Sequence, residues 1–295
     1  SKLGIKKNTR SNAITYLIVI VAFVLFTILS NGGVLGRKTV GLLVPACCYI
    51  VMAISLNLTV GILGELSLGH AGFMSVGAFA GVVASTGLSS TITSAPLRLA
   101  VAMVIGALFA AIAGFLIGIP VLRLRGDYLA IVTLAFGEII KEIISCLIVG
   151  TDEKGLHIVF NYNGAKTVDD LGLTPTGTAI IKGAQGATGT QTIASFTAGF
   201  VLIMVALVIV LNFVNSRSGR AVMAIRDNRI AAESVGINIT KYKMIAFTIS
   251  AAIAGAAGAL YGLNYSNITS AKFDFNTSIL ILVFVVLGGL GNIRG

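Results

Sequence analysis

Long apolar runs recur along the whole chain and constrain its fold more than any other feature of the sequence. A helix of about 20 apolar residues crosses a hydrocarbon core of about 30 Å. The composition agrees, because 56% of the 295 residues are hydrophobic and only 11% are charged, whereas about 25% are charged in an ordinary soluble domain. We therefore predict an all-α, polytopic integral membrane protein with about eight transmembrane helices in one domain over residues 1–295. The predicted spans are residues 14–30, 41–60, 66–87, 99–122, 127–149, 192–214, 244–263 and 276–291.

The distribution of basic residues predicts the orientation of these spans. With the N-terminus inside, 13 of the 21 Lys and Arg residues fall in cytoplasmic segments, seven fall outside and Lys141 lies within a span. Because cytoplasmic segments are enriched in Lys and Arg, this asymmetry predicts a cytoplasmic N-terminus. The first apolar run lacks a small-residue cleavage site, so we expect it to be retained. The net charge of +10 does not indicate nucleic-acid binding, because the basic residues lack interleaved aromatic residues.

A polar segment over residues 150–191, predicted to lie outside, is too long to be a simple turn. It is rich in Gly, Thr and Asp and shows no apolar periodicity. A docking surface and a disordered excursion are both compatible with this pattern.

A second polar segment, residues 215–243, is predicted to be cytoplasmic and structured. It contains a short helical pattern from Arg229 to Val235. Asp227 or Asn228 can cap the start of this helix, and Gly236 suits the left-handed residue that follows a helix end.

The same short helix has three interpretations. Arg229 and Glu233 have the i,i+4 spacing of a salt bridge, so the helix can simply be a solvated, charged one. The six basic residues of the segment also suit the anionic inner leaflet of a membrane. The third interpretation is a helix seated in a groove on a partner protein, which its small apolar face favours. That face consists of Ile230, Ala231, Ala232 and Val235.

The stretch GELSLGHAGF places Glu65, Ser67 and His70 among glycines in the third span. Glycines there permit close helix packing, and they allow the backbone to unwind where it is sheltered from lipid. Ser67 and His70, three residues apart, can form a hydrogen-bonded pair that either lines a cavity or joins neighbouring helices. An intramembrane Ser-His hydrolase is a weaker interpretation, because the only other histidine, His157, lies in the outer segment. Glu65, near the cytoplasmic mouth, is predicted to serve an interface.

The fifth span, DYLAIVTLAFGEIIKEII, carries Glu138, Lys141 and Glu142 inside an apolar helix. Glu138 lies about 16 Å along the helix axis from Asp127, near the middle of the bilayer. An ion pair between Glu138 and Lys141 would offset part of the cost of burying these charges. Charges at this depth usually face the interior of a bundle or an aqueous pathway, so Glu138 and Lys141 are candidates for a translocation path.

No nucleotide or metal site is expected in this chain. The sequence has no G-x-x-x-x-G-K-[ST] phosphate loop, and GGLGNIRG near its end lacks the lysine and hydroxyl residue of such a loop. If ATP drives the protein, a partner subunit binds it. The cysteines have neither metal nor disulfide spacing and are predicted to be packing residues. They are Cys47, Cys48 and Cys146.

Four blocks of the sequence resemble the permease subunits of high-affinity branched-chain amino acid ABC importers, of the LivM type. The blocks are GELSLGHAGFMSVGAFA, RLRGDYLAIVTLAFGEIIK, GRAVMAIRDNRIAAESVGINITKYKMIAFTISAAIAGAAGALYG and VLGGLGNIRG, and they cover most of residues 60–295 in the family's order. The resemblance implies a non-catalytic permease of the cytoplasmic (inner) membrane, without a cofactor of its own. It also implies a sister permease, two cytoplasmic ATPases that hold ATP and Mg, and an extracytoplasmic substrate-binding protein.

The resemblance also implies roles for particular residues. The loop from Arg226 to Gly236 is expected to couple ATP hydrolysis to transport. Ser67 and His70 are expected near the translocation path. The expected coupling residues are Arg226, Asp227, Arg229, Glu233 and Gly236.

The chain departs from the family pattern in two places. A Gly-rich segment of the T-G-G type usually follows the fifth span, where this chain has TDEKGL at residues 151–156. This departure bears on docking to the binding protein and on the identity of the substrate. The family also continues through further helices beyond the position of Gly295, and this chain starts at Ser1 without Met. We therefore expect trimming at both ends.

Three classes of function stay open at this point. Co-purification of an ATPase would favour an ATP-driven permease, with sugar or nucleoside permeases as close alternatives for the substrate. Uptake driven by a proton gradient without ATP would favour an ion-coupled transporter with Glu138 as the relay. Hydrolysis abolished by Ser67→Ala would favour an intramembrane enzyme.

Overall fold

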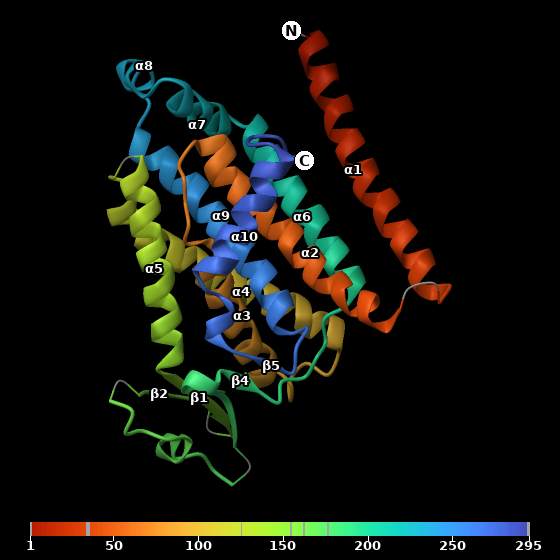
Figure 1. Cartoon of the computed structure of the whole chain (residues 1–295), viewed down its shortest axis with the longest axis vertical. Coiled ribbons are helices and arrows are strands. Elements are labelled where there is room, and N and C mark those ends of the chain that lie inside the picture. Colours follow the sequence, from red (N-terminus) through yellow and green to blue (C-terminus); the bar gives the residue numbers. More distant parts are fainter. Residues whose placement is uncertain are drawn as a thin grey trace.

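A computed structural model describes residues 2–33, 36–124, 126–153, 155–161, 163–175 and 177–293, with side chains for all of these except residues 2–11 and 127. The chain forms a bundle of long helices with a small β-sheet at one end and two short helices at the other (Figure 1). Some residues counted in the charge asymmetry, together with both chain ends, lie outside the described residues. They are Ser1, Arg125, Lys154, Arg294 and Gly295.

Helices occupy all eight predicted spans. Six segments are long and apolar enough to cross a membrane by length and composition, and they belong to α1, α2, α4, α6, α9 and α10. The other two predicted spans, α3 and α5, do not meet that measure, because α3 is rich in small and polar residues and α5 carries several charges. The polytopic helical class is thus confirmed. The helices of the bundle are α1 (Lys2–Asn31), α2 (Arg37–Asn57), α3 (His70–Gly87), α4 (Ala95–Val121), α5 (Asp127–Ser145), α6 (Phe196–Asn215), α9 (Ile239–Gly262) and α10 (Phe275–Gly288).

Helix α9 lies at the centre of the bundle against α2, α3 and α4. Glycines hold these contacts because they let the backbones approach closely. A Cβ atom on Gly77 of α3 would lie 2.0 Å from the carbonyl oxygen of Gly255 on α9. Likewise, a Cβ atom on Gly258 would lie 1.9 Å from the carbonyl oxygen of Met74. The prediction that glycines of the third span serve helix packing is confirmed for Gly77.

The connection between α2 and α3 is irregular. Helix α2 passes into one π-helical segment, η1 (Leu58–Leu63), and Gly64 follows with a left-handed φ of 77°. Residues 65–69 are not helical, and α3 begins only at His70. The predicted start of the third span at residue 66 was therefore wrong, because these small and polar residues leave the helix instead of opening it.

The polar segment predicted to lie outside contributes to a β-sheet, which the sequence did not predict. Its strand order is β2-β1-β3-β4-β5, with antiparallel pairing throughout. Strand β1 begins at Leu147, so the fifth span ends at Ser145 and not at residue 149. Within the part of the chain that the structure describes, this segment is an ordered cap over one end of the helices (Figure 1). The strands are β1 (Leu147–Asp152), β2 (Gly155–Phe160), β3 (Thr178–Lys182), β4 (Ala187–Thr188) and β5 (Asn267–Ile268).

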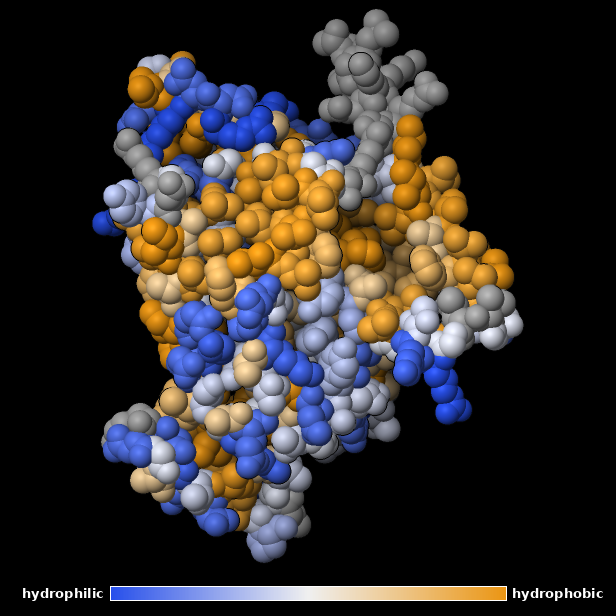
Figure 2. All heavy atoms as spheres, in the orientation of Figure 1, coloured by the Kyte–Doolittle hydropathy of each residue, from blue (hydrophilic) through white to orange (hydrophobic). Residues whose placement is uncertain are grey.

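Short 3₁₀ turns and two helices complete the chain. Helices α7 and α8 lie at the end of the bundle opposite the sheet, on the same side as the start of α1 (Figure 1). An apolar band separates these two polar ends, as Figure 2 shows. Polar ends on either side of an apolar band are the arrangement expected of a membrane-spanning bundle. The remaining elements are η2 (Val168–Leu171), η3 (Gly183–Gln185), α7 (Arg217–Asp227), α8 (Arg229–Ser234) and η4 (Ser270–Lys272).

Helix α1 stands apart from the bundle (Figure 1). In its most apolar stretch, within Asn12–Asn31, only 6% of the residues are buried. Its contact with the bundle includes Phe23, which stacks on Phe196 and Phe200 of α6 with ring centroids 5.2 and 4.2 Å away. Within Asn12–Asn31, α1 therefore packs little against the rest of the bundle.

Candidate functional site

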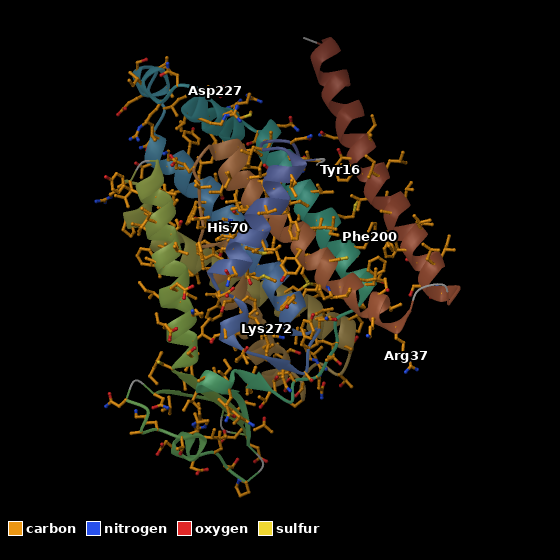
Figure 3. The ribbon with its side chains drawn as sticks, in the orientation of Figure 1. Tyr16, Arg37, His70, Phe200, Asp227 and Lys272 are labelled. Atoms are coloured by element: carbon orange, nitrogen blue, oxygen red, sulfur yellow. The ribbon has the colours of Figure 1, made fainter. Side chains whose placement is uncertain are left out.

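A buried polar network lies among α2, α3 and α9 in the interior of the bundle, around His70 (Figure 3). The hydroxyls of Ser55 and Ser250 each donate to the other residue's carbonyl oxygen, at 2.6 and 2.7 Å. The hydroxyl of Thr59 donates to Ser250 Oγ at 2.9 Å. His70 Nε2 lies 2.7 Å from Ser250 Oγ, and His70 Nδ1 lies 3.3 Å from Ser67 Oγ.

These contacts fix the tautomer of His70. Since the Ser250 proton points to the Ser55 carbonyl, Ser250 Oγ must accept from the ring. Nε2 therefore carries the proton, and Nδ1 accepts from Ser67. This assignment follows from the hydrogen-bond pattern and not from observed hydrogens.

The predicted pairing of Ser67 with His70 is confirmed, and the network shows what the pair does in this conformation. His70 is 1% exposed and joins α3 to α9. Among the described residues, no carboxylate forms a hydrogen bond to His70, so the network lacks the orienting acid of a hydrolytic triad. Sequence reasoning missed Ser250, although a lone serine inside the apolar run FTISAAIAG was a usable signal.

Glu65 forms a buried ion pair with Lys243, at the start of α9. The two side chains are 13% and 3% exposed. Glu65 was predicted to serve an interface; in the structure it instead joins the irregular connection to α9 within the chain. Lys243 was counted only as a basic residue of the cytoplasmic loop, because sequence spacing cannot show a partner 178 positions away.

The predicted ion pair on α5 is confirmed, because Lys141 Nζ contacts the Glu138 carboxylate. Glu142 Oε1 lies 3.8 Å from the same ammonium group. The Glu142 side chain is 70% exposed and that of Glu138 is 39% exposed, within a predicted membrane span. Such charges cannot face hydrocarbon without a large cost, so this face of α5 requires protein or water beside it.

Helices α7 and α8 lie where the coupling loop was predicted. The Asn228 side chain accepts from Ala231 N at 3.0 Å, so Asn228 caps α8. Asp227 instead accepts from the Arg226 guanidinium at 2.9 and 3.0 Å. Gly236 has the predicted left-handed φ, at 84°. No ion pair joins Arg229 to Glu233 among the described residues, which corrects that prediction; surface pairs on so short a helix gain little energy.

Large apolar side chains are exposed at α8, beside the exposed polar residues Glu233 and Ser234. Ile230 is 82% exposed, and nearby Val235 is 73% exposed. Ala232 on the opposite side is buried against Ile225 and Ile239. A helix that holds its alanine inward and presents two large apolar side chains outward fits a groove on a partner.

Arg226 turns towards the bundle. Its Nη1 donates to the carbonyl oxygen of Gly61 in η1 at 3.0 Å. A Cβ atom on Gly64 would lie 2.5 Å from Arg226 Cγ, so the arginine stem packs directly on that glycine.

No group of three metal-ligating side chains occurs among the described residues. Cys47 and Cys48 are buried, Cys146 is partly buried, and all three are free thiols. Their placement agrees with the predicted packing role.

Comparison with known proteins gives consistent matches. The family of branched-chain amino acid transport system permease components matches residues 38–295. The high-affinity branched-chain amino acid permease protein LivM of Escherichia coli K12 is 34% identical over 263 residues, which cover 87% of this chain and 60% of that protein. A probable LivM of Methanocaldococcus jannaschii is 26% identical over 84% of this chain and 74% of its own length. The E. coli LivH permease protein is 35% identical over 94 residues, 32% of this chain and 30% of its own length.

The chain spans about 60% of the length of the bacterial LivM proteins that it matches. No solved structure matches it.

Proposed function

The chain belongs to the family of permease components of branched-chain amino acid transport systems, and from this premise we propose that it is the membrane-spanning permease subunit of an ATP-binding-cassette importer. Its cargo is a branched-chain amino acid delivered by a substrate-binding protein. The observation that carries the proposal is the 34% identity to LivM over 87% of the chain.

The partners in this proposal are a sister permease, two cytoplasmic ATPases with ATP and Mg, and an extracytoplasmic binding protein. The similarity of one part of the chain to LivH supports a related sister subunit. The charged, exposed face of α5 supports a protein or aqueous neighbour within the membrane. The large apolar side chains exposed at α8 support a cytoplasmic partner with a groove.

The proposed orientation places the N-terminus, α7 and α8 in the cytoplasm and the sheet outside the plasma membrane. The start of α1 lies at the same end of the bundle as α7 and α8, which supports this orientation (Figure 1). The chain itself performs no chemical reaction in this proposal, and hydrolysis of ATP belongs to the partner.

The path residues proposed from the sequence divide into two groups. Glu138 and Lys141 lie on the open face of α5, where a path between two permeases would run. Ser67 and His70 are buried in this conformation, so they line a path only if α3 and α9 separate during transport.

Reconstitution into vesicles with the sister permease, ATPase and binding protein tests the proposal. We expect ATP-dependent uptake of labelled leucine, and no uptake when ATP is replaced by a proton gradient. Labelled ribose and a labelled nucleoside are tested in the same way as the alternative substrates. Uptake of either in place of leucine would keep the importer class but reject the substrate, and uptake without ATP would reject the class.

A further inference from the structure

The irregular connection between α2 and α3 is tied directly to the helices predicted to meet the ATPase. We call residues 58–69 the break, because η1, Gly64 and the non-helical residues 65–69 interrupt the helical path there. Non-helical backbone at membrane depth is tolerated only inside protein or beside water. π-Helical turns often occur at functional sites.

The first tie joins α7 to the break through Arg226. Its Nη1 donates to the Gly61 carbonyl oxygen at 3.0 Å, while Nε and Nη2 are held by Asp227. The packing of the Arg226 stem on Gly64 leaves no room for a larger residue. Since the guanidinium is fixed at both sides, a displacement of the end of α7 acts directly on η1.

The second tie joins the start of α9 to the break through Lys243 and Glu65. Only residues 235–238 separate α8 from α9, so α8 and Lys243 are close along the chain. The pair is buried, and separating it would leave a charge without its partner in a poorly solvated place. The break must therefore follow Lys243 when α9 shifts at this end.

The residues on either side of the break, Asn57 before it and His70 after it, are held to other elements. The Asn57 side chain accepts from Gly291 N at 2.9 Å and donates to the Asn292 carbonyl oxygen at 3.1 Å. Beyond the break, His70 is bonded to Ser250 at 2.7 Å. The break is thus held at both ends, and a movement of Arg226 on α7 relative to these ends deforms it.

We propose that Arg226 and Lys243 are positioning residues that transmit displacement of α7–α8 to the break, and through it to the start of α3. Arg226 then acts inside the permease and not as a contact to the ATPase. The inference rests on the proposed function, because it needs an ATPase that moves α7–α8.

The deciding variant is Arg226→Gln, which removes the charged donor to Gly61. Arg220→Gln is its matched control, because Arg220 lies on the same helix and donates to the Asn215 carbonyl oxygen, which lies outside the break. Arg226→Lys keeps one charged donor and should restore most of the wild-type behaviour. Comparison of Arg226→Lys with Arg226→Gln also distinguishes a loss of transmitted movement from a failure of the permease to fold.

The Lys243 tie needs a double variant, because Lys243→Met alone buries the Glu65 carboxylate without a partner. Glu65→Gln with Lys243→Met removes both charges together. Lys241→Met is the control, since Lys241 is exposed and forms no ion pair among the described residues.

Two readouts are required in the reconstituted complex. The first is leucine taken up per ATP hydrolysed. The second uses a chain that lacks its three native cysteines and carries one new cysteine at position 66, where Leu66 is a partly exposed residue of the break. It measures how much ATP changes the rate at which a thiol reagent modifies that cysteine. For Arg226→Gln we expect uptake per ATP to fall at least about tenfold, as for the loss of one hydrogen bond to a charged group, with the ATPase still bound. We also expect the ATP-dependent change at residue 66 to disappear.

The outcomes separate the inference from the function on which it rests. If the wild-type complex shows no ATP-dependent uptake, the proposed function is wrong and the inference falls with it. If the wild type couples normally and Arg226→Gln retains both readouts, the inference alone is overturned. The same holds if Arg226→Gln merely releases the ATPase, because Arg226 would then be a contact residue.

Discussion

At the scale of single residues, Ser250 is the member of the buried network with the most partners. One hydroxyl serves Ser55, Thr59 and His70 at once. Buried polar groups without partners carry a desolvation cost, so such a network is stabilising only when it is complete. The sequence could predict the local pair Ser67–His70 from its spacing and could mark Ser250 as a lone serine in an apolar run. It could not show that Ser250 is the partner of His70, because the contact between α3 and α9 is set by packing over 180 positions.

Ser250→Ala should therefore destabilise the protein. It leaves His70 Nε2 and the Thr59 hydroxyl without their partner, at a cost of about 1–3 kcal/mol. The measurement is the midpoint of thermal unfolding in detergent. Ser234→Ala is the control, since Ser234 is exposed and its hydroxyl donates to the Ala231 carbonyl oxygen within α8. An equal midpoint for Ser250→Ala and wild type would contradict the assigned network.

The charges of α5 give a second prediction at this scale. Glu138→Gln leaves Lys141 with a weaker partner within the membrane, so assembly or transport should be impaired. Replacing both Glu138 and Lys141 by leucine should recover much of the assembly, measured as the yield of complex in detergent. If the double variant assembles no better than the single one, each charge has a role independent of the pair.

At the scale of elements, the sequence predicted what depends on local pattern and missed what depends on distant pairing. The eight helices at the predicted spans follow from apolar length, and α8 follows from Asn228 and Gly236. The sheet was missed because its strands are short, and because β4 finds its partner β5 about 80 residues later. The π-helical turn was missed because no residue preference marks it, and only the contacts of Gly61 and Gly64 explain it.

Helix α8 supplies a prediction about partner binding. Ile230→Asp places a charge at an exposed apolar position of α8 and should weaken ATPase binding by about 2 kcal/mol or more, if Ile230 is a central contact. Thr240→Asp adds the same charge in the first turn of α9 and should have little effect. The measurement is the amount of ATPase that stays bound to each variant as the volume of detergent wash increases. Equal retention would assign α8 to the membrane surface instead.

Gly236→Val tests the exit of α8. A β-branched residue at φ 84° is strained by about 1–3 kcal/mol, so the path from α8 to α9 should change or loosen. We expect lower transport with normal membrane insertion. Transport equal to that of the wild type would show that this exit tolerates another conformation.

At the scale of the whole molecule, the polar ends are distinct. Helices α7 and α8 lie at one end and the sheet at the other, with the apolar band between them (Figures 1 and 2). The alternation of spans and the basic asymmetry predicted this separation from the sequence.

Single cysteines test the topology. In a chain that lacks its three native cysteines, a cysteine at Ser218 in α7 and one at Thr178 in β3 should react from opposite sides of the membrane. An impermeant thiol reagent added to intact cells should modify only the residue in the sheet. Modification of both from outside would overturn the orientation.

The sheet also places a constraint on biogenesis. Strand β5 lies between α9 and α10, whereas the other four strands lie between α5 and α6. In the proposed orientation the four earlier strands lie outside the membrane, but β4 has no second neighbour until the α9–α10 turn has crossed as well. Because such non-local pairing forms late, we expect the sheet to close only once the helix pairs α5–α6 and α9–α10 are inserted with the same orientation. A chain with an inverted α9–α10 pair would leave β4 as an open sheet edge.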